Sequence, residues 1–187
     1  IRRILLRLSL DKVVELRPNK GAVIATPAAE DVRQIFAARR LLEIGIIDDA
    51  CKHCTAADTQ VLKDIVAREN AAIQSGDRSG AIRLAGEFHV QLAGVARNKP
   101  IQELLRQLVA QSSLALALYE APGHLLCVDD DHINIVNAVA GGEAVKCRNL
   151  MAHHLEKAEA EMRLDAPQDN NDLKSVFAEV IEARATA

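Results

Sequence analysis

Three histidines in this sequence, His89, His132 and His154, have the residue type and the spacing to bind a metal ion together. His132 lies nine residues before the Gly141-Gly142 break, and His154 lies twelve residues after it. If two helices fold back on each other there, a rise of ~1.5 Å per residue puts the two rings at similar heights, within ~5 Å. Imidazole nitrogen is a common ligand for zinc, nickel and similar ions. Three such rings inside a helical bundle would form a metal site with open positions for water or a ligand.

Each of these histidines also has an ordinary structural explanation. A single histidine on a helix is more often exposed, or hydrogen-bonded in the core, than a metal ligand, and the chain has six histidines in all. Only the order and spacing of the three together favour a metal site. Of the neighbours His153 and His154, one at most can face such a site, because consecutive residues point in different directions on a helix.

The composition is typical of a globular, mainly helical protein. The chain has 187 residues, of which 49% are hydrophobic and 2% aromatic, as in helical bundles rich in Ala, Leu and Val. Its apolar runs are far shorter than the ~20 residues that cross a membrane. No signal-peptide cleavage pattern follows the basic N-terminus. We therefore expect a cytoplasmic protein without a membrane partner.

The cysteines favour the same compartment. Cys51 and Cys54 form one C-x-x-C sequence around His53. Because no second C-x-x-C follows, a structural zinc ribbon is not supported. The pattern favours small, partly buried, reduced thiols, which are typical of cytoplasmic proteins. A redox or metal-binding role for the pair is the alternative.

Positive charge is concentrated at the N-terminus. Residues 1–20 carry six basic and two acidic side chains, although the whole chain has a net charge of −3. A basic segment on an acidic body suggests that only this segment meets a polyanion such as DNA. With one tyrosine, three phenylalanines and no tryptophan, stacking on single-stranded bases is disfavoured.

The same segment changes from a helical to a strand pattern. Residues 1–12 have the apolar face of an amphipathic helix. Residues 13–17 and 22–25 have strand character around a turn over 18–21, which predicts a β-hairpin with a basic tip. A helix followed by such a hairpin is the second half of a winged helix-turn-helix. A small α/β appendage with ordinary surface charge is the alternative.

After residues 26–27 the pattern predicts helices only. Thr26 can cap a helix and Pro27 suits a first helical turn. Thr55 and Asp58 form a capping box that opens the second helix. The six predicted helices cover about 28–53, 55–76, 79–96, 100–120, 128–140 and 143–164. A polar break over 167–171 and a short final helix over 173–185 complete the chain.

The N-terminal residues resemble the end of the DNA-binding domain of GntR-family transcription regulators. The family pattern V-R-x-A-L-x-x-L, then G-L-[VI], then P-N-x-G-x-x-V corresponds to Ile-Arg-Arg-Ile-Leu-Leu-Arg-Leu and the later Pro-Asn-Lys-Gly-Ala-Val-Ile. The resemblance implies that Arg2 and Arg3 face the major groove of double-stranded operator DNA. It implies that Lys20 and Gly21 approach the minor groove, where glycine lets the backbone come close. Lys12 stands where the family usually has glycine. The family's first helices have no counterpart here, so we expect this chain alone to bind DNA poorly.

The residues from 28 to 164 resemble the FCD effector domain of the FadR-type subgroup of that family. The markers are Arg39-Arg40-Leu41-Leu42-Glu43, Phe88-His89, Asn98, His132 and Met151-x-x-His154-Leu155. In many members three histidines and one aspartate bind a divalent metal at the floor of a ligand pocket. The resemblance therefore implies that His89, His132 and His154 bind zinc or nickel, and that His153 lies on the surface. Ala85 replaces the aspartate, so we expect three histidines plus water or effector, or a weaker site that loads only with ligand.

Two further residues are implicated in effector binding. Arg39 corresponds to an arginine that often faces the family's pocket, and a guanidinium can bind a carboxylate through two parallel hydrogen bonds. An intrahelical pair with Glu43, four residues on, is the alternative for Arg39. Asn98 either points into the pocket or caps a helix.

These observations predict a mainly α protein with three parts. Residues 1–26 are the remnant of a winged helix-turn-helix with a β-hairpin wing. Residues 27–166 form an antiparallel bundle of six to seven helices for effector binding and dimerisation, and 167–187 form a C-terminal tail.

The predicted function is a ligand-responsive, homodimeric transcription regulator of bacterial type and not an enzyme. It would bind operator DNA and a small carboxylate or sugar-acid metabolite, the latter on a divalent metal. The alternative is a helical-bundle metalloenzyme in which the three-histidine centre activates water. The sequence places no convincing general base near these histidines.

Overall fold

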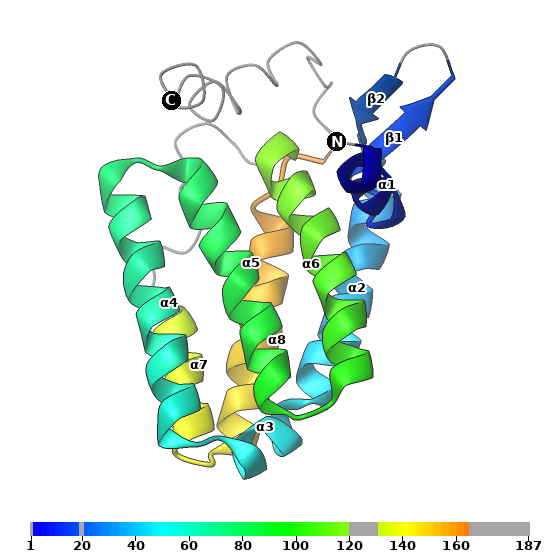
Figure 1. The fold of residues 1–187 in the computed structure, drawn as a ribbon. Helices are drawn as coiled ribbons and strands as arrows, with labels where there is room; N and C mark the ends of the chain where they lie inside the picture. The colour runs from blue at the N-terminus through cyan, green and yellow to red at the C-terminus, as the bar shows by residue number, and fades with distance from the viewer. Residues whose placement is uncertain (1, 19–20, 120–130, 165–187) are drawn as a thin grey trace.

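The computed structural model describes residues 2–18, 21–119 and 131–164, which are mainly helical as predicted (Figure 1). The first elements are α1 (Arg2–Leu10), β1 (Val14–Arg17) and β2 (Gly21–Ile24). The two strands pair antiparallel, with Val14 opposite Ile24. The predicted N-terminal helix and β-hairpin are therefore confirmed.

Lys12 makes the turn between α1 and β1. Its backbone lies in the left-handed region, with a φ of 58°, which favours glycine because glycine has no Cβ. The amide of Lys12 donates to the Ser9 carbonyl and the amide of Val13 donates to the Leu8 carbonyl, so the turn closes the end of α1. The glycine that the GntR pattern has at this position suits the same backbone.

Six of the following helices pack side by side in a closed ring (Figure 1). The helices after the hairpin are α2 (Ala29–Gly45), α3 (Ile47–His53), α4 (Ala56–Ser75), α5 (Arg78–Val95), α6 (Lys99–Tyr119), α7 (Asp131–Ala140) and α8 (Ala144–Ala160). Around the ring, α2 packs on α6, α6 on α5, α5 on α4, α4 on α7, α7 on α8, and α8 on α2. The short α3 closes one end by packing on α5, α7 and α8. Each helix of the ring therefore turns one face toward a common core.

Apolar residues at helical spacing build this core. On α4, the buried Leu62, Ile65 and Val66 share one face. Phe88 of α5 and Leu155 of α8 are completely buried. Burial of one such side chain stabilises the fold by about 1.5–3 kcal/mol. These apolar faces set which residues of each helix point inward, including the polar ones described below.

Sequence signals explain most of the helix ends. The Thr55 hydroxyl accepts from the amide of Asp58 and the Asp58 carboxylate accepts from the amide of Thr55, so the predicted capping box opens α4. Gly76 ends α4 with a φ of 76°. Gly142, with a φ of 68°, makes the tight turn that returns α8 alongside α7. The predicted fold-back between His132 and His154 is therefore confirmed.

Two predictions about helix ends are wrong. The predicted single helix over 28–53 is two helices, because the chain turns at Ile46, whose amide bonds back to the carbonyl of Leu42. The buried side chains of Ile46 and Ile47 fix this turn in the core. Thr26 does not cap α2: the N-cap is Ala28, whose amide donates to the Asp31 carboxylate at 3.2 Å.

Several predictions fall outside the described residues. These are Lys20 at the hairpin tip, the start of the fifth predicted helix at 128–130, the break over 167–171, the final helix over 173–185 and the rest of the tail over 167–187. Within the described ranges, no helix combines the length and apolar character needed to span a membrane.

Candidate metal centre

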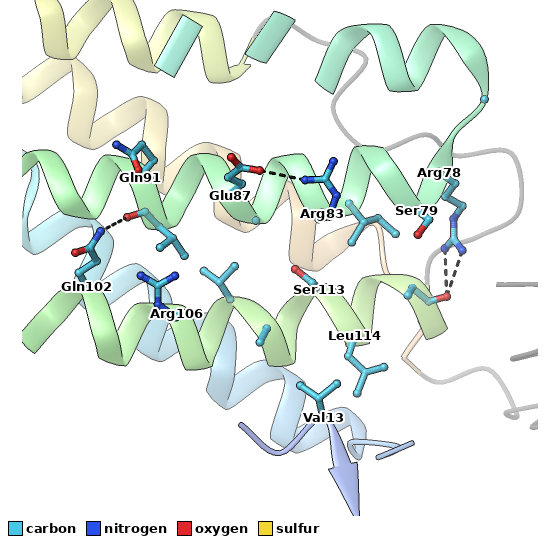
Figure 2. Close-up of a pocket in the computed structure, with 17 residues that line it drawn as sticks. Val13, Arg78, Ser79, Arg83, Glu87, Gln91, Gln102, Arg106, Ser113 and Leu114 are labelled. Atoms are coloured by element: carbon cyan, nitrogen blue, oxygen red, sulfur yellow. Dashed lines mark hydrogen bonds and ion pairs between the residues drawn. The ribbon is translucent and has the colours of Figure 1, made fainter. Parts of the chain in front are cut away.

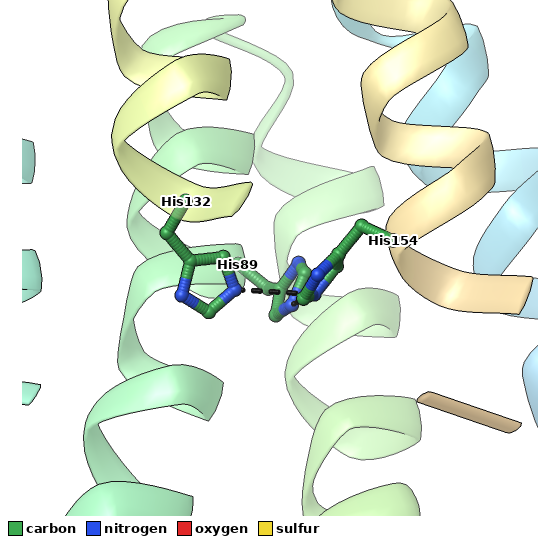
Figure 3. A group of neighbouring side chains, drawn as sticks. All are labelled: His89, His132 and His154. Carbon is green, nitrogen blue, oxygen red and sulfur yellow. Dashed lines mark hydrogen bonds between the residues drawn. The ribbon is translucent and has the colours of Figure 1, made fainter. Parts of the chain in front are cut away.

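The three predicted histidines meet at the centre of the ring (Figure 3). His89 comes from α5, His132 from α7 and His154 from α8, and each is 3–4% exposed. The Nε2 atom of His154 lies 3.1 Å from Nε2 of His132 and 3.2 Å from Nε2 of His89. The ring centroids of His132 and His154 are 4.5 Å apart. The expected proximity of these two rings is therefore confirmed.

A carboxylate lies behind each imidazole, on the side away from the other histidines. Glu43 Oε2 of α2 is 2.5 Å from His89 Nδ1, and Glu69 Oε2 of α4 is 2.7 Å from His132 Nδ1. Asp131 Oδ2 is 3.6 Å from His154 Nδ1, which is within ion-pair range but long for a hydrogen bond. A carboxylate at Nδ1 favours the tautomer in which Nδ1 donates its proton and Nε2 presents a lone pair.

Burial controls the protonation of the cluster. It lowers the pKa of His89 to about 3, although the neighbouring Glu43 opposes this change. It also lowers the pKa of His132 well below the ordinary value. Both rings are therefore neutral near pH 7, which is the state that binds metals.

The carboxyl groups respond differently to burial. Burial raises the pKa of Glu69 to about 7. For Glu43, the charge of Arg39 and the hydrogen bonds from His89 and Arg39 outweigh burial and hold the pKa at about 2. The side chain of His154 lowers the pKa of Asp131 below its usual value. Glu43 is thus the carboxylate whose negative charge is most firmly held.

Arg39 joins this network from α2. Its Nε donates to Glu43 Oε1 at 2.7 Å and its Nη1 donates to Ser112 Oγ of α6 at 3.0 Å. The predicted alternative, an intrahelical pair with Glu43, is therefore observed. The third nitrogen, Nη2, is buried and has no hydrogen-bond partner in the described part of the chain. Arg39 consequently keeps one donor that a bound ligand could use.

The polar side chains that are buried among the described residues all belong to this one network. They are Arg39, Glu43, Glu69, His89, Ser112, His132 and His154. Together they come from all six helices of the ring. Burying so many polar groups is unfavourable unless they are paired. Their concentration at one point therefore indicates a binding site rather than a set of unrelated buried polar residues.

The residues present fit a divalent cation. When each Nδ1 donates its proton to a carboxylate, the three Nε2 lone pairs face one another and repel. A cation between them would replace this repulsion by attraction. Nε2 separations of 3.1 and 3.2 Å are close to the edge of about 3.3 Å that tetrahedral zinc–imidazole bonds of ~2.0–2.1 Å would give. Three carboxylates surround the histidines, whereas the described cations near them are Arg39 and Lys157, whose Nζ is 3.7 Å from Asp131.

The other predicted site residues lie away from this centre or at its edge. Asn98 caps α6, because its Oδ1 accepts from the amide of Ile101 at 3.3 Å, which is the second of the two alternatives. Ala85 is half-buried on α5, and His153 is exposed as expected. In the N-terminal unit, which consists of α1, β1 and β2, the residues Arg2, Arg3 and Gly21 are all exposed.

Sequence reasoning missed the outer carboxylates. Glu43 was predicted only as a partner for Arg39, and Asp131 was not predicted as a site residue. Glu69 had a usable signal: it continues the buried stripe of Leu62, Ile65 and Val66 at helical spacing. A charged residue at a core position of a helix is a candidate site residue.

Two other features lie outside the centre. A groove of about 860 Å³ runs between α5 and α6 and is lined by side chains such as Arg83, Glu87 and Arg106, but by none of the three histidines (Figure 2).

Cys51 and Cys147 are free thiols, as predicted for Cys51, and burial raises the pKa of Cys147 to about 12. A thiol with a raised pKa is a poor nucleophile.

Comparison with known proteins places the chain in a family. The FCD domain family matches residues 34–157. The chain is 29% identical over 139 residues to the HTH-type transcriptional regulator LutR of Bacillus subtilis, covering 70% of this chain and 61% of LutR. It is 26% identical over 181 residues to the Uxu operon regulator of Haemophilus influenzae, covering 87% and 66%. The chain thus spans less than two thirds of the length of both relatives.

Solved structures show the same fold. A transcriptional regulator GntR from Rhodococcus sp. RHA1 superimposes with a TM-score of 0.72 at 23% identity, over 85% of this chain and 76% of that one. The family match covers most of the helical ring and all three histidines. The relatives and structural neighbours of this chain are transcription regulators and not enzymes. The chain therefore belongs to the FCD-domain family of GntR-type transcription regulators.

Proposed function

We propose that the helical ring is the effector-binding domain of a ligand-responsive, cytoplasmic transcription regulator. His89, His132 and His154 hold a divalent metal, zinc or nickel, and a small organic acid binds beside it. The full-length protein binds double-stranded operator DNA as a homodimer. The observation that carries the proposal is the convergence of three buried Nε2 atoms, with a carboxylate behind each ring.

The bound acid would be recognised by two kinds of group. A metal in the centre supplies a positive charge with open positions for oxygen ligands. Arg39 Nη2, which has no partner in the described residues, donates to a carboxylate oxygen. Ser112 and Glu43 hold the guanidinium in place from two helices, so its donor is already oriented before the acid arrives. A carboxylate or sugar acid suits this pair of groups.

A path for the signal runs from Arg39 to the DNA-binding unit. Arg39 ties α2 to α6 through Ser112. At the other end of the same helices, the hydroxyl of Tyr119 on α6 donates to the carbonyl of Pro27, just before α2, at 2.5 Å. A shift of α2 against α6 would therefore move the connection to the hairpin. The acid acts as a switch if it binds one of the two arrangements more tightly.

The N-terminal unit would contact DNA. Arg2 and Arg3 are exposed on α1, and Gly21 is exposed at the start of β2. In the GntR pattern these positions and Lys20 approach the major and minor grooves. The metalloenzyme alternative is not retained, because the relatives and structural neighbours are regulators.

Native mass spectrometry of the protein as purified tests the proposal. We expect a dimer with one divalent metal per chain, and a further small mass if the effector co-purifies. The metal should disappear on dialysis against a chelator while the dimer remains. A monomer without metal, which also takes up no added zinc or nickel, would overturn the proposal.

A further inference from the structure

Glu69 is a buried carboxyl group whose only hydrogen-bond partner among the described residues is a histidine. Its side chain comes from α4, is 2% exposed, and contacts Nδ1 of His132 at 2.7 Å. Among the described residues no lysine or arginine pairs with it, and its only ion-pair partner there is His132. A buried carboxylate without a cationic partner is strongly unfavourable. Its position therefore calls for a positive charge that the described residues do not provide.

The other two outer carboxylates are already compensated. Glu43 is paired with Arg39 at 2.7 Å. Asp131 is 3.7 Å from Lys157 and 18% exposed to solvent. Of the three carboxylates behind the histidines, Glu69 alone has no lysine or arginine partner among the described residues, and it lies one imidazole ring away from the point where the Nε2 atoms meet.

Ala85 explains why such a charge is needed. It lies one helical turn before His89 on α5, so both residues share a face of that helix. An acidic residue there would add a negative ligand, whereas alanine adds none. Imidazole ligands carry no negative charge, so three of them alone leave both charges of a divalent ion uncompensated in the core.

We propose that Glu69 supplies, through His132, the negative charge toward the metal that Ala85 does not supply. Glu69 is thus the main positioning residue of the site, and the metal's remaining positions stay open for the acid. This inference rests on the proposed metal-dependent function. In this inference Glu69, which does not bind the metal directly, supplies the negative charge that a metal-bound carboxylate would otherwise supply.

Zinc affinity in a set of variants tests this role. The zinc dissociation constant is measured by competition with a coloured chelator, and the melting temperature of each metal-free protein is recorded. We expect Glu69→Gln to bind zinc 10–100-fold more weakly, with a metal-free melting temperature equal to or above that of the unmodified protein. A residue with a merely structural role would lower the melting temperature instead.

Two further variants complete the test. Glu87→Gln is the matched control, because Glu87 is exposed, lies on α5 two residues from His89, and forms ion pairs with Arg68 and Arg83. The zinc affinity of this variant should not change. Adding Ala85→Asp to Glu69→Gln should restore zinc affinity to within a few-fold of the starting value, since the negative charge returns by another route.

The outcomes separate this inference from the proposed function. If the unmodified protein binds no zinc or nickel, the metal part of the proposed function fails and the inference falls with it. If the unmodified protein binds zinc and Glu69→Gln binds it equally well, the inference alone is overturned. Should Glu69→Gln not fold, Glu69→Leu takes its place, because an apolar side chain of similar volume removes the carboxylate without burying an unpaired polar group: we expect the same 10–100-fold weaker zinc binding, and unchanged binding would overturn the role given to Glu69.

Discussion

An arginine–carboxylate ion pair at the same helical spacing occurs in two parts of the molecule with very different surroundings. In α1, Arg7 donates to Asp11 at 3.1 Å, and the arginine side chain is 58% exposed. In α2, Arg39 donates to Glu43 at 2.7 Å, and the two side chains are 4% and 1% exposed. Both pairs are four residues apart on a helix. Spacing therefore creates the pair, but the elements packed around it decide whether the pair matters to the fold.

The contrast extends to the two units as a whole. No residue of α1 is buried, and its apolar Ile4 and Leu10 are 64% and 68% exposed. The ring instead encloses a network of charged side chains at its centre. The helix α1 leaves its side chains exposed, whereas the ring buries charged side chains at its centre. Variants that treat both units alike should therefore have unequal effects.

The largest difference is expected from removing each arginine. Arg39→Ala should lower the free energy of unfolding by about 3–5 kcal/mol, because it leaves the Glu43 carboxylate buried without its cation. Arg7→Ala should lower it by no more than about 0.5 kcal/mol, as for exposed pairs at this spacing. Urea unfolding followed by circular dichroism measures both. Equal effects of the two substitutions would show that the buried network adds no more stability than the surface pair.

Removal of a histidine should abolish the stabilisation by metal. With free zinc at 100 times the dissociation constant, binding stabilises the folded state by about 2.7 kcal/mol, and the melting temperature rises accordingly. His132→Ala should lose most of this rise, because a ligand at the centre is gone. His153→Ala is the matched control, since His153 is exposed beside His154 and should keep the full rise.

Hydrogen exchange can show where zinc acts. Zinc should slow exchange of amides in α5, α7 and α8, which carry the histidines, and leave those of α1 unchanged. Protection that spread equally over α1 would mean that the two units unfold together and that the contrast between them is smaller than their burial suggests.

The metal-free protein should become less stable as the pH falls. Burial lowers the pKa of His89 to about 3 and also that of His132, both from an ordinary value of 6.5. Below that value the unfolded chain binds protons that the folded chain does not, so each histidine costs about 1.4 kcal/mol of stability per pH unit. Glu69 acts in the opposite direction between pH 4.5 and about 7, because its raised pKa lets the folded state hold a proton there.

Two histidines outweigh one carboxyl group, so the net stability should fall from about pH 6.5 downward. The fall should steepen below about 4.5, where the effect of Glu69 ends and the Glu43 carboxylate, with a pKa of about 2, begins to lose its contribution. Unfolding in urea at pH 7, 6 and 5 measures this slope. His89→Gln should make it shallower, and a stability independent of pH in this range would contradict the burial of neutral rings.

Much of this arrangement could be predicted from local patterns. The capping box at Thr55 and the fold-back at Gly142 depend on a few neighbouring residues, and the meeting of His132 and His154 follows from counting residues along two helices. The family resemblance added His89 and correctly set aside His153. These successes share one property: each depends on spacing along the chain or on a known pattern.

The rest depended on which helices become neighbours. Glu69 lies behind His132 only because α4 packs on α7, and Ser112 reaches Arg39 only because α6 packs on α2. Neither packing follows from the chain order. The break at Ile46 was missed for a similar reason, since the burial of Ile46 and Ile47 in the core, and not their helix propensity, fixes the turn.

The smallest effect is expected in the N-terminal unit. Lys12 has a φ of 58° between α1 and β1, and a side chain with a Cβ is strained there by about 1–2 kcal/mol. Glycine avoids this strain but makes the unfolded chain more flexible. The amides of Val13 and Ala25 close this unit by donating to the Leu8 and Val13 carbonyls. Lys12→Gly should therefore raise the protection of these two amides in hydrogen exchange by up to about 1 kcal/mol.

Lys12→Ala separates the causes, because it removes the charge but keeps the Cβ and should give no protection. If alanine protects as well as glycine, the backbone is not the reason, and the charge of Lys12 on the basic N-terminal unit is. Zinc affinity should be the same in both variants, because α1 and the hairpin contain no part of the buried network.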